Sequence, residues 1–295
     1  MNGSRRPLLA WIALGIALFL ITSTARAAYS TATTNGWFVF AGRVAGLNNS
    51  LFRTDVWVFN PDATQGATVT FVFREQGGAA TPVVSTGIVL APRETKFFPD
   101  LTFVAPVPAG DGKVGSLEFH ADRPVMGSAR IYTTSATGTF GFFLPAIPIT
   151  ESMGPKQSSS DTTNVLQMFG VNASDTNFRT NLDVTNTSSA SVTIQVRVIH
   201  PTTGEVIGGT REFGVAAKAL IRLGQILTTV GAPAIDGLRI TVALKEDAVL
   251  PGDVGGILAV ATTLDNRTND AFAFVGQRQS GTVVAAGLLS VSALP

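Results

Sequence analysis

The chain repeats a short segment of itself, and this repeat constrains the fold more than any other feature. Residues 52–55 read Phe-Arg-Thr-Asp, and residues 178–181, 126 positions later, read Phe-Arg-Thr-Asn. The same offset pairs Asn60 with Asn186. A period well above about 50 residues is too long for a solenoid unit and indicates a duplicated domain. Because a duplicated scaffold usually presents surfaces rather than one assembled active site, we look for function on its surfaces.

Both copies of the repeat have the alternating pattern of a half-buried β-strand. Apolar or small residues share one face in the two copies: Phe52, Thr54, Val56 and Val58, then Phe178, Thr180, Leu182 and Val184. The next strand fits an offset of 123, which pairs Val69 with Val192, so the copies differ in length within their loops. Further strands are expected at residues 83–90, 95–98, 115–120, 125–133 and 139–144, with turns at 122–124 and 135–138. A short helix is an option at residues 219–227.

Short strands at roughly 10-residue spacing indicate an all-β fold. We expect two tandem antiparallel β-sandwich domains of the immunoglobulin-like kind after an N-terminal signal segment. The expected boundaries are a signal peptide at 1–27, a first domain at 28–149, a polar linker at 150–163 and a second domain at 164–295. The apolar tail at 281–295 is either a last strand or an arm that pairs with an open sheet edge. Each half is expected to fold alone when the chain is cut within residues 154–162.

Residues 1–27 have the features of a secretory signal peptide. Arg5 and Arg6 precede an uncharged, mostly apolar stretch at 7–24, and Ala25-Arg26-Ala27 matches a small-x-small cleavage site. A retained membrane anchor is the alternative, because the apolar stretch approaches spanning length. Cleavage predicts an exported protein, in the periplasm, at the cell surface or outside the cell, with no membrane span in the mature chain.

Cleavage also changes the charge. Taking Arg5, Arg6 and Arg26 from the 21 basic residues leaves 18 against 20 acidic ones, a net charge of −2. A near-neutral protein lacks the positive field that nucleic-acid binding needs, so we expect no nucleic-acid partner. The chain has no cysteine, which excludes disulfides, thiol catalysis and cysteine-ligated zinc. In a secreted chain of this size, that composition is more typical of bacteria.

Little in the sequence indicates catalysis. It lacks a Gly-x-Ser-x-Gly elbow, a His-Glu-x-x-His zinc motif and a phosphate-binding loop. Its two histidines, His120 and His200, are expected at solvated strand ends. We therefore expect no enzyme, although the paired carboxylates of a glycoside hydrolase can be distant in sequence. Calcium is the one cofactor left open, because four aspartates fall in expected loops: Asp111, Asp253, Asp265 and Asp270.

The arrangement resembles the tandem immunoglobulin-like or fibronectin-like β-sandwich repeats of secreted bacterial proteins. The residues that carry the resemblance are those at 52–55 followed by Asn60-Pro61-Asp62, and those at 178–181 followed by Asn186. The second copy lacks the proline and the aspartate after its asparagine. The resemblance covers most of the mature chain and implies a surface or matrix role, with no catalytic residues to carry over.

The face of the first repeat strand opposite its apolar side holds the candidate partner-contact residues: Arg53, Asp55, Trp57 and Phe59. Arg53 recurs as Arg179, which fits a ligand-facing guanidinium, a cross-strand ion pair or a bond to a loop. Trp57 and Phe59 correspond instead to Asp183 and Thr185, so only the first copy has aromatic residues there. An apolar patch outside a core usually marks an interface. That interface is with the linker, the N-terminal strand or the second domain, or else with a partner protein or a glycan.

We therefore predict a non-enzymatic exported protein with a structural, adhesion or surface-assembly role, which binds through sheet faces or edges. The alternative is a secreted protein that binds or cleaves carbohydrate.

Overall fold

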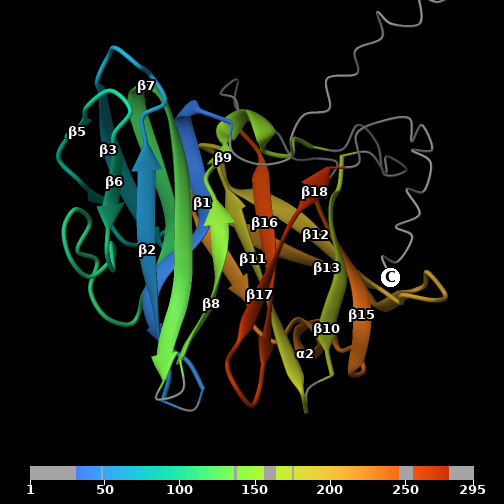
Figure 1. Ribbon diagram of the computed structural model, residues 1–295. Helices are drawn as coiled ribbons and strands as arrows, with labels where there is room; N and C mark the ends of the chain where they lie inside the picture. The colour runs from blue at the N-terminus through green and yellow to red at the C-terminus, as the bar shows by residue number, and fades with distance from the viewer. Residues whose placement is uncertain are drawn as a thin grey trace, which may run out of the picture.

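The computed structural model describes residues 31–47, 49–135, 138–155, 164–174, 176–245 and 255–278. These residues are nearly all β-strand, and the named strands pair in antiparallel fashion (Figure 1). The all-β class predicted from the alternating patterns is therefore confirmed. The expected signal peptide at 1–27 and the apolar tail at 281–295 lie outside the described residues.

The strands of the first half join into one antiparallel sheet that bends into two layers. One layer contains β1 (Thr33–Ala45), β3 (Ala67–Glu75), β4 (Val83–Val84), β5 (Ile88–Leu90), the start of β7 (Lys113–Ser135) and β9 (Ile147–Pro148). The other layer contains β2 (Leu51–Phe59), β6 (Thr95–Phe98), the rest of β7 and β8 (Gly138–Pro145). The single strand expected at 83–90 is thus two short ones.

The strand β7 runs continuously through residues 122–124, where the sequence predicts a turn, so that prediction is wrong. Residues 113–121 and Val125 pair with β1 or β3, and residues 126–135 pair with β2 or β8. At the crossing, the Asp122 carboxylate accepts a hydrogen bond from the Thr68 amide at 2.7 Å, and Pro124 has no amide hydrogen to donate. The turn-forming residues therefore move the chain from one layer to the other instead of reversing it.

The second half has two separate sheets and a short helix. One sheet contains β10 (Leu166–Ala173), β12 (Val192–Ile199), β13 (Val206–Val215), β15 (Ile235–Leu244) and β18 (Gln277–Arg278). The other contains β11 (Phe178–Asn186), β14 (Leu220–Leu223), β16 (Ile257–Asp265) and β17 (Ala271–Val275). Residues 219–227, where a helix was an option, are divided between β14 and the helix α2 (Ile226–Val230).

The two halves have the same pairing scheme. β2 lies between β6 and the second part of β7, just as β11 lies between β14 and β16. β1 and β3 flank the first part of β7, just as β10 and β12 flank β15. The correspondence seen in short sequence segments therefore extends to the layers of both halves.

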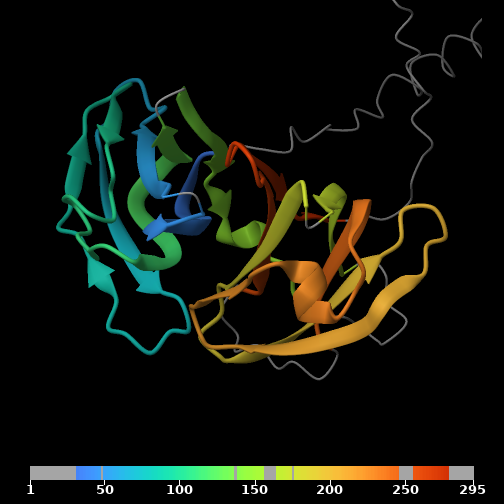
Figure 2. The same cartoon turned by 90° about the horizontal axis from the view of Figure 1, so that it is seen from below.

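Each half buries its own apolar cluster, and the halves also pack on each other (Figure 2). Phe71 and Phe119 lie in the first cluster, and Leu182 and Ile240 lie in the second. The first cluster continues into the second half through residues such as Leu258. The contact between the halves is thus part of the buried interior.

Residues 149–155, at the start of the expected linker, are ordered against the second half. They begin with a turn of 3-10 helix, η1 (Ile149–Glu151). Met153 is buried in the second cluster, and its backbone exchanges hydrogen bonds of 2.8 and 3.0 Å with Ile257. The chain therefore anchors itself to the second half before residue 156.

Candidate functional site

The outward side of the layer formed by β6, β2, β7 and β8 carries exposed aromatic rings. We call this surface the open face and define it by Arg53, Asp55, Trp57, Phe97, Arg130, Tyr132 and Phe143. The Trp57 ring stacks on Phe97 with centroids 4.8 Å apart and lies 6.3 Å from the Phe143 ring. Phe97 is 49% exposed and Phe143 is 63% exposed. The alternation predicted for residues 52–59 is confirmed for Phe52, Thr54, Val56 and Val58, which are buried, but Asp55 on the opposite side of the strand is buried as well.

Strand register brings these rings together. Trp57 lies opposite Phe97 on β6 and opposite Ser128 on β7. Arg130, two residues along β7 from Ser128, lies opposite Phe143 on β8. Since diagonal neighbours in a sheet are within reach of aromatic side chains, the small Ser128 lets Trp57 and Phe143 approach each other over β7.

Two guanidinium groups and one hydroxyl border the aromatic rings. Arg53 and Arg130 both lie over the Tyr132 ring, at 5.7 and 4.6 Å from its centroid. Burial raises the pKa of Tyr132, and the nearby Asp55 raises it further, so this hydroxyl stays protonated. The Asp55 carboxylate accepts a hydrogen bond from the Asp100 amide at 2.9 Å. Within the described residues neither Arg53 nor Arg130 forms an ion pair.

Of the residues predicted from sequence, Trp57 is the centre of the open face, and Arg53 and Asp55 lie beside it. Phe59 continues the same face of β2 and is partly buried. Sequence reasoning missed Phe97 and Phe143, although it placed strands at both positions. Alternation shows which side of a strand a residue occupies but not which strands become neighbours, so the three-ring cluster was not predictable from it.

The corresponding side of the second half carries Arg179, Asn181, Asp183 and Thr185, and we call it the covered face. Asp183 and Thr185 are fully buried. The covering element is the apolar run of β1: the Thr185 hydroxyl donates a hydrogen bond to the Val39 carbonyl at 2.9 Å, and the Arg222 guanidinium lies 4.2 Å from the Phe40 ring centroid. The second half thus packs against β1, and in the described residues it leaves Phe97 and Phe143 of the open face exposed.

The same register position holds different chemistry in the two faces. Trp57 lies opposite Phe97 in the first half, and Asp183 lies opposite Arg222 in the second. Arg222 donates two hydrogen bonds to the Asp183 carboxylate, at 2.8 and 2.9 Å. A stacked aromatic pair in one half therefore corresponds to a two-pronged ion pair in the other.

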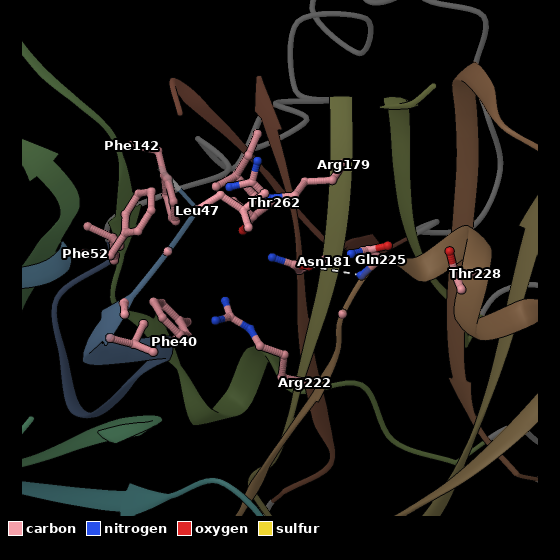
Figure 3. A pocket seen from close by; sticks show the side chains of 16 residues that line it. Phe40, Leu47, Phe52, Phe142, Arg179, Asn181, Arg222, Gln225, Thr228 and Thr262 are labelled. Atoms are coloured by element: carbon pink, nitrogen blue, oxygen red, sulfur yellow. Dashed lines mark hydrogen bonds between the residues drawn. The ribbon is translucent and has the colours of Figure 1, made fainter. Parts of the chain in front are cut away.

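A cleft of about 570 Å³ opens between the halves, beside the covered face (Figure 3). The first half supplies an apolar wall that includes Phe40, Leu47, Phe52 and Phe142. The second half supplies a polar wall: Arg179, Asn181, Arg222, Gln225, Thr228 and Thr262. Figure 3 shows both guanidinium groups reaching from the second half toward the apolar wall.

Arg179 is held at the rim of this cleft by neutral groups. It donates hydrogen bonds to the side-chain oxygens of Asn266 at 2.7 Å and Asn269 at 2.9 Å. Asn269 in turn donates to the Leu47 carbonyl of the first half at 3.1 Å. Burial lowers the pKa of Arg179, and the more distant Asp265 partly offsets this. Of the roles considered for the two matched arginines, Arg179 bonds to a loop, whereas Arg53 stacks on a tyrosine.

The remaining candidates have structural partners. His120 lies within β7 rather than at a strand end, and its Nε2 is 3.0 Å from the buried Glu118 carboxylate. His200 follows the end of β12, as predicted, and its Nδ1 accepts from the amides of Thr202 and Thr203. The Glu118 carboxylate also accepts from Arg74 at 3.1 Å, so His120 belongs to a charged cluster on the strand.

The aspartates considered for calcium cap turns or pair with arginine. Asp111 binds Arg43. Asp265 accepts from the amides of residues 267 and 268, and Asp270 accepts from the Ala271 amide. Asp253 lies outside the described residues. In the part of the chain that the structure describes, no three acidic or histidine side chains gather as metal ligands would, and no helix is long and apolar enough to cross a membrane.

Comparison with known proteins gives little further information. No protein-family model matches the chain, and no curated protein is similar to it. Among solved structures, the chain is similar to the crystal structure of Thermotoga maritima 1070, with 11% sequence identity and a TM-score of 0.32. That similarity covers 39% of this chain and 94% of the other.

Proposed function

We propose that this is a non-enzymatic exported protein of two tandem immunoglobulin-like sandwich domains, which binds a partner protein through its open face. Export rests on the signal-like residues 1–27, and the domain division rests on the repeated pairing scheme and the two apolar clusters. The role is structural, such as adhesion or surface assembly. The observation that carries the proposal is the three-ring cluster of Trp57, Phe97 and Phe143 on an uncovered sheet.

The distribution of polarity supports a binding role for that cluster. Ordinary packing places aromatic side chains inside and charged pairs outside. At the same register position this protein does the reverse, because Asp183 of the ion pair is fully buried, whereas Phe97 of the aromatic pair is exposed and Trp57 is half-buried. An exposed apolar patch on a folded protein usually marks an interaction site.

The structure itself offers an example of what covers such a face. In the second half the equivalent surface is covered by a strand of another sandwich layer, β1, through Val39 and Phe40. The open face also has the composition of a protein-binding hot spot, which is enriched in tryptophan, tyrosine and arginine. We therefore assign it a protein partner that presents a sheet surface, with an acidic side chain for Arg53 and Arg130.

Site-specific photo-cross-linking tests this proposal in the cells that produce the chain. A photoreactive phenylalanine analogue at position 143 is expected to yield one discrete protein adduct. Phe272, 53% exposed on the corresponding strand β17 of the second half, is the matched control position and should yield none. Adding Trp57→Ala should reduce the adduct from position 143 at least about tenfold, the effect of losing one hot-spot residue.

Three results contradict the proposal. One is an equal yield of the same adducts from positions 143 and 272, which indicates random contact. Another is an adduct that glycosidases remove, which indicates the carbohydrate-binding alternative. The third is an adduct between two copies of the chain, which makes the face a self-association surface. Far-ultraviolet circular dichroism of each variant confirms that the strands persist.

A further inference from the structure

We propose a second, separate binding site: the cleft between the halves binds a small amphipathic carboxylate, with its charged end on Arg179 and its apolar body against Phe40, Phe52 and Phe142. This site goes beyond the proposed function, because Phe52 and Phe142 line the cleft from the inner side of the layer whose outward side is the open face. Its size, about 570 Å³, is within the range of about 300–1,000 Å³ typical of small-ligand pockets. Such pockets also form preferentially between packed domains.

The cleft has the polarity of an amphipathic ligand. Its wall from the first half is built of aromatic and aliphatic side chains, which favour contact with an apolar body. Its opposite wall has convergent hydrogen-bonding groups on β11, β14 and α2. Asn181 accepts a hydrogen bond from the Gln225 amide through its side-chain oxygen at 3.1 Å, which fixes its position. A mostly apolar pocket with a few placed polar groups fits one ligand orientation.

The charge of the cleft identifies the ligand as an anion. Two arginines line it, and no acidic side chain does so among the described residues. Arg222 is neutralised by Asp183 directly behind it. Arg179 bonds to two neutral amide oxygens and forms no ion pair in the described part of the chain, where Asp265 acts on it only from a greater distance. A guanidinium has five N–H donors, and two are used here, which leaves donors for a carboxylate.

Because the cleft lies between the halves, a bound ligand is expected to hold them together. Leu47 and Phe40 belong to the first half, whereas Arg179 and Gln225 belong to the second. A ligand in the cleft contacts both, and binding to the packed state alone stabilises that packing by mass action. Saturating ligand should therefore raise the unfolding temperature of the whole chain.

The test uses the mature protein and three probes: decanoate, decanol and acetate. Isothermal titration calorimetry is expected to show one decanoate per chain. Decanol lacks the charge and acetate lacks the apolar body, so each should bind at least about tenfold more weakly than decanoate. Decanoate should also raise the unfolding temperature, and neither of the other probes should do so at equal concentration.

Two variants and one control locate the site. Arg179→Gln keeps a polar side chain but removes the charge, and it should weaken decanoate binding at least about tenfold. Gly224→Leu extends an apolar side chain into the cleft: a Cβ atom at this position meets only the Asn181 side-chain oxygen within 4 Å, at 3.7 Å, so the variant should fold and lose binding. Arg53→Gln is the matched control, because Arg53 occupies the equivalent strand position on the open face, and it should bind decanoate as the natural chain does.

The proposal is overturned if decanoate and decanol bind equally, since the charge then plays no part. It is also overturned if Arg53→Gln loses as much affinity as Arg179→Gln, or if Gly224→Leu binds normally. Absence of decanoate binding at millimolar concentration overturns it as well. Failure of the open face to bind a partner protein leaves these measurements unaffected, so the two proposals are tested independently.

Discussion

The open face and the covered face are built on the same strand pairing but have opposite surroundings. In the covered face a bidentate ion pair, Asp183–Arg222, is enclosed beneath β1. In the open face a stacked pair, Trp57–Phe97, occupies the equivalent register and remains at the surface. Removing charge from water costs free energy unless the pair is well bonded, whereas burying aromatic rings is favourable. The difference teaches that the same strand pairing accepts either an ion pair or an aromatic pair at this register position.

The largest expected effect separates the two tryptophans of the described residues, Trp37 and Trp57. Trp37 lies on β1, is fully buried and carries Lys218 5.7 Å from its ring centroid, so it belongs to the contact between the halves. Trp37→Ala should lower the free energy of unfolding by about 3–5 kcal/mol. Trp57→Ala loses mainly a surface ring pair, so it should cost about 1 kcal/mol. Chemical denaturation measures both, and equal losses would contradict the distinction between the faces.

The buried ion pair should have the next largest effect. Asp183→Asn removes the charge that neutralises Arg222 inside the contact between the halves. We expect a loss of about 2 kcal/mol, as for a charged hydrogen bond left without its partner. Asp55→Asn is the control, because its oxygen can still accept from the Asp100 amide. If Asp183→Asn and Asp55→Asn lower the free energy of unfolding equally, the covered ion pair has no special role in stability.

A smaller effect on stability, but a decisive one on binding, should follow from exchanging the chemistry of the faces. The double variant Trp57→Asp with Phe97→Arg places the second half's ion pair on the open face. Because surface ion pairs contribute only about 0–1 kcal/mol, the free energy of unfolding should change by about 1 kcal/mol or less. Cross-linking from position 143 should nevertheless be lost. A variant that keeps its cross-link shows that Trp57 and Phe97 do not form the contact.

The smallest expected effect is a pH dependence from Glu118, which lies opposite Trp37 in register. Burial raises the pKa of Glu118, but hydrogen bonds and charge from His120 and Arg74 outweigh this and lower it. Because the folded pKa is depressed, the stabilisation is present above the unfolded pKa, about 4.3 for glutamate, and is lost as the pH falls through the folded pKa. Glu118→Gln should flatten the fall in unfolding free energy with acidification. Urea titrations at several pH values measure this. If the unfolding free energy falls as steeply with pH in the variant as in the natural chain, Glu118 makes no such contribution.

Sequence reasoning predicted what depends on neighbouring residues along the chain. The alternation at 52–59 placed Trp57 outward, and the β6 bounds were predicted at residues 95–98. The prediction failed where a distant contact decides the outcome. Proline and aspartate at 122–124 favour a turn locally, but pairing with four other strands keeps β7 continuous. The burial of Asp183 likewise could not be predicted from the sequence pattern of β11, because β1 of the other half covers it.

The continuous β7 has a consequence for cooperativity. A strand shared by two layers cannot separate from one without loosening the other, so the first half should open as a single unit in native-state hydrogen exchange. In the second half the same positions are two separate strands, β15 and β16, in different sheets. Its layers can therefore open one at a time. The chain thus combines a half that is expected to unfold in one step with a half that can loosen in stages, and the cleft lies between them.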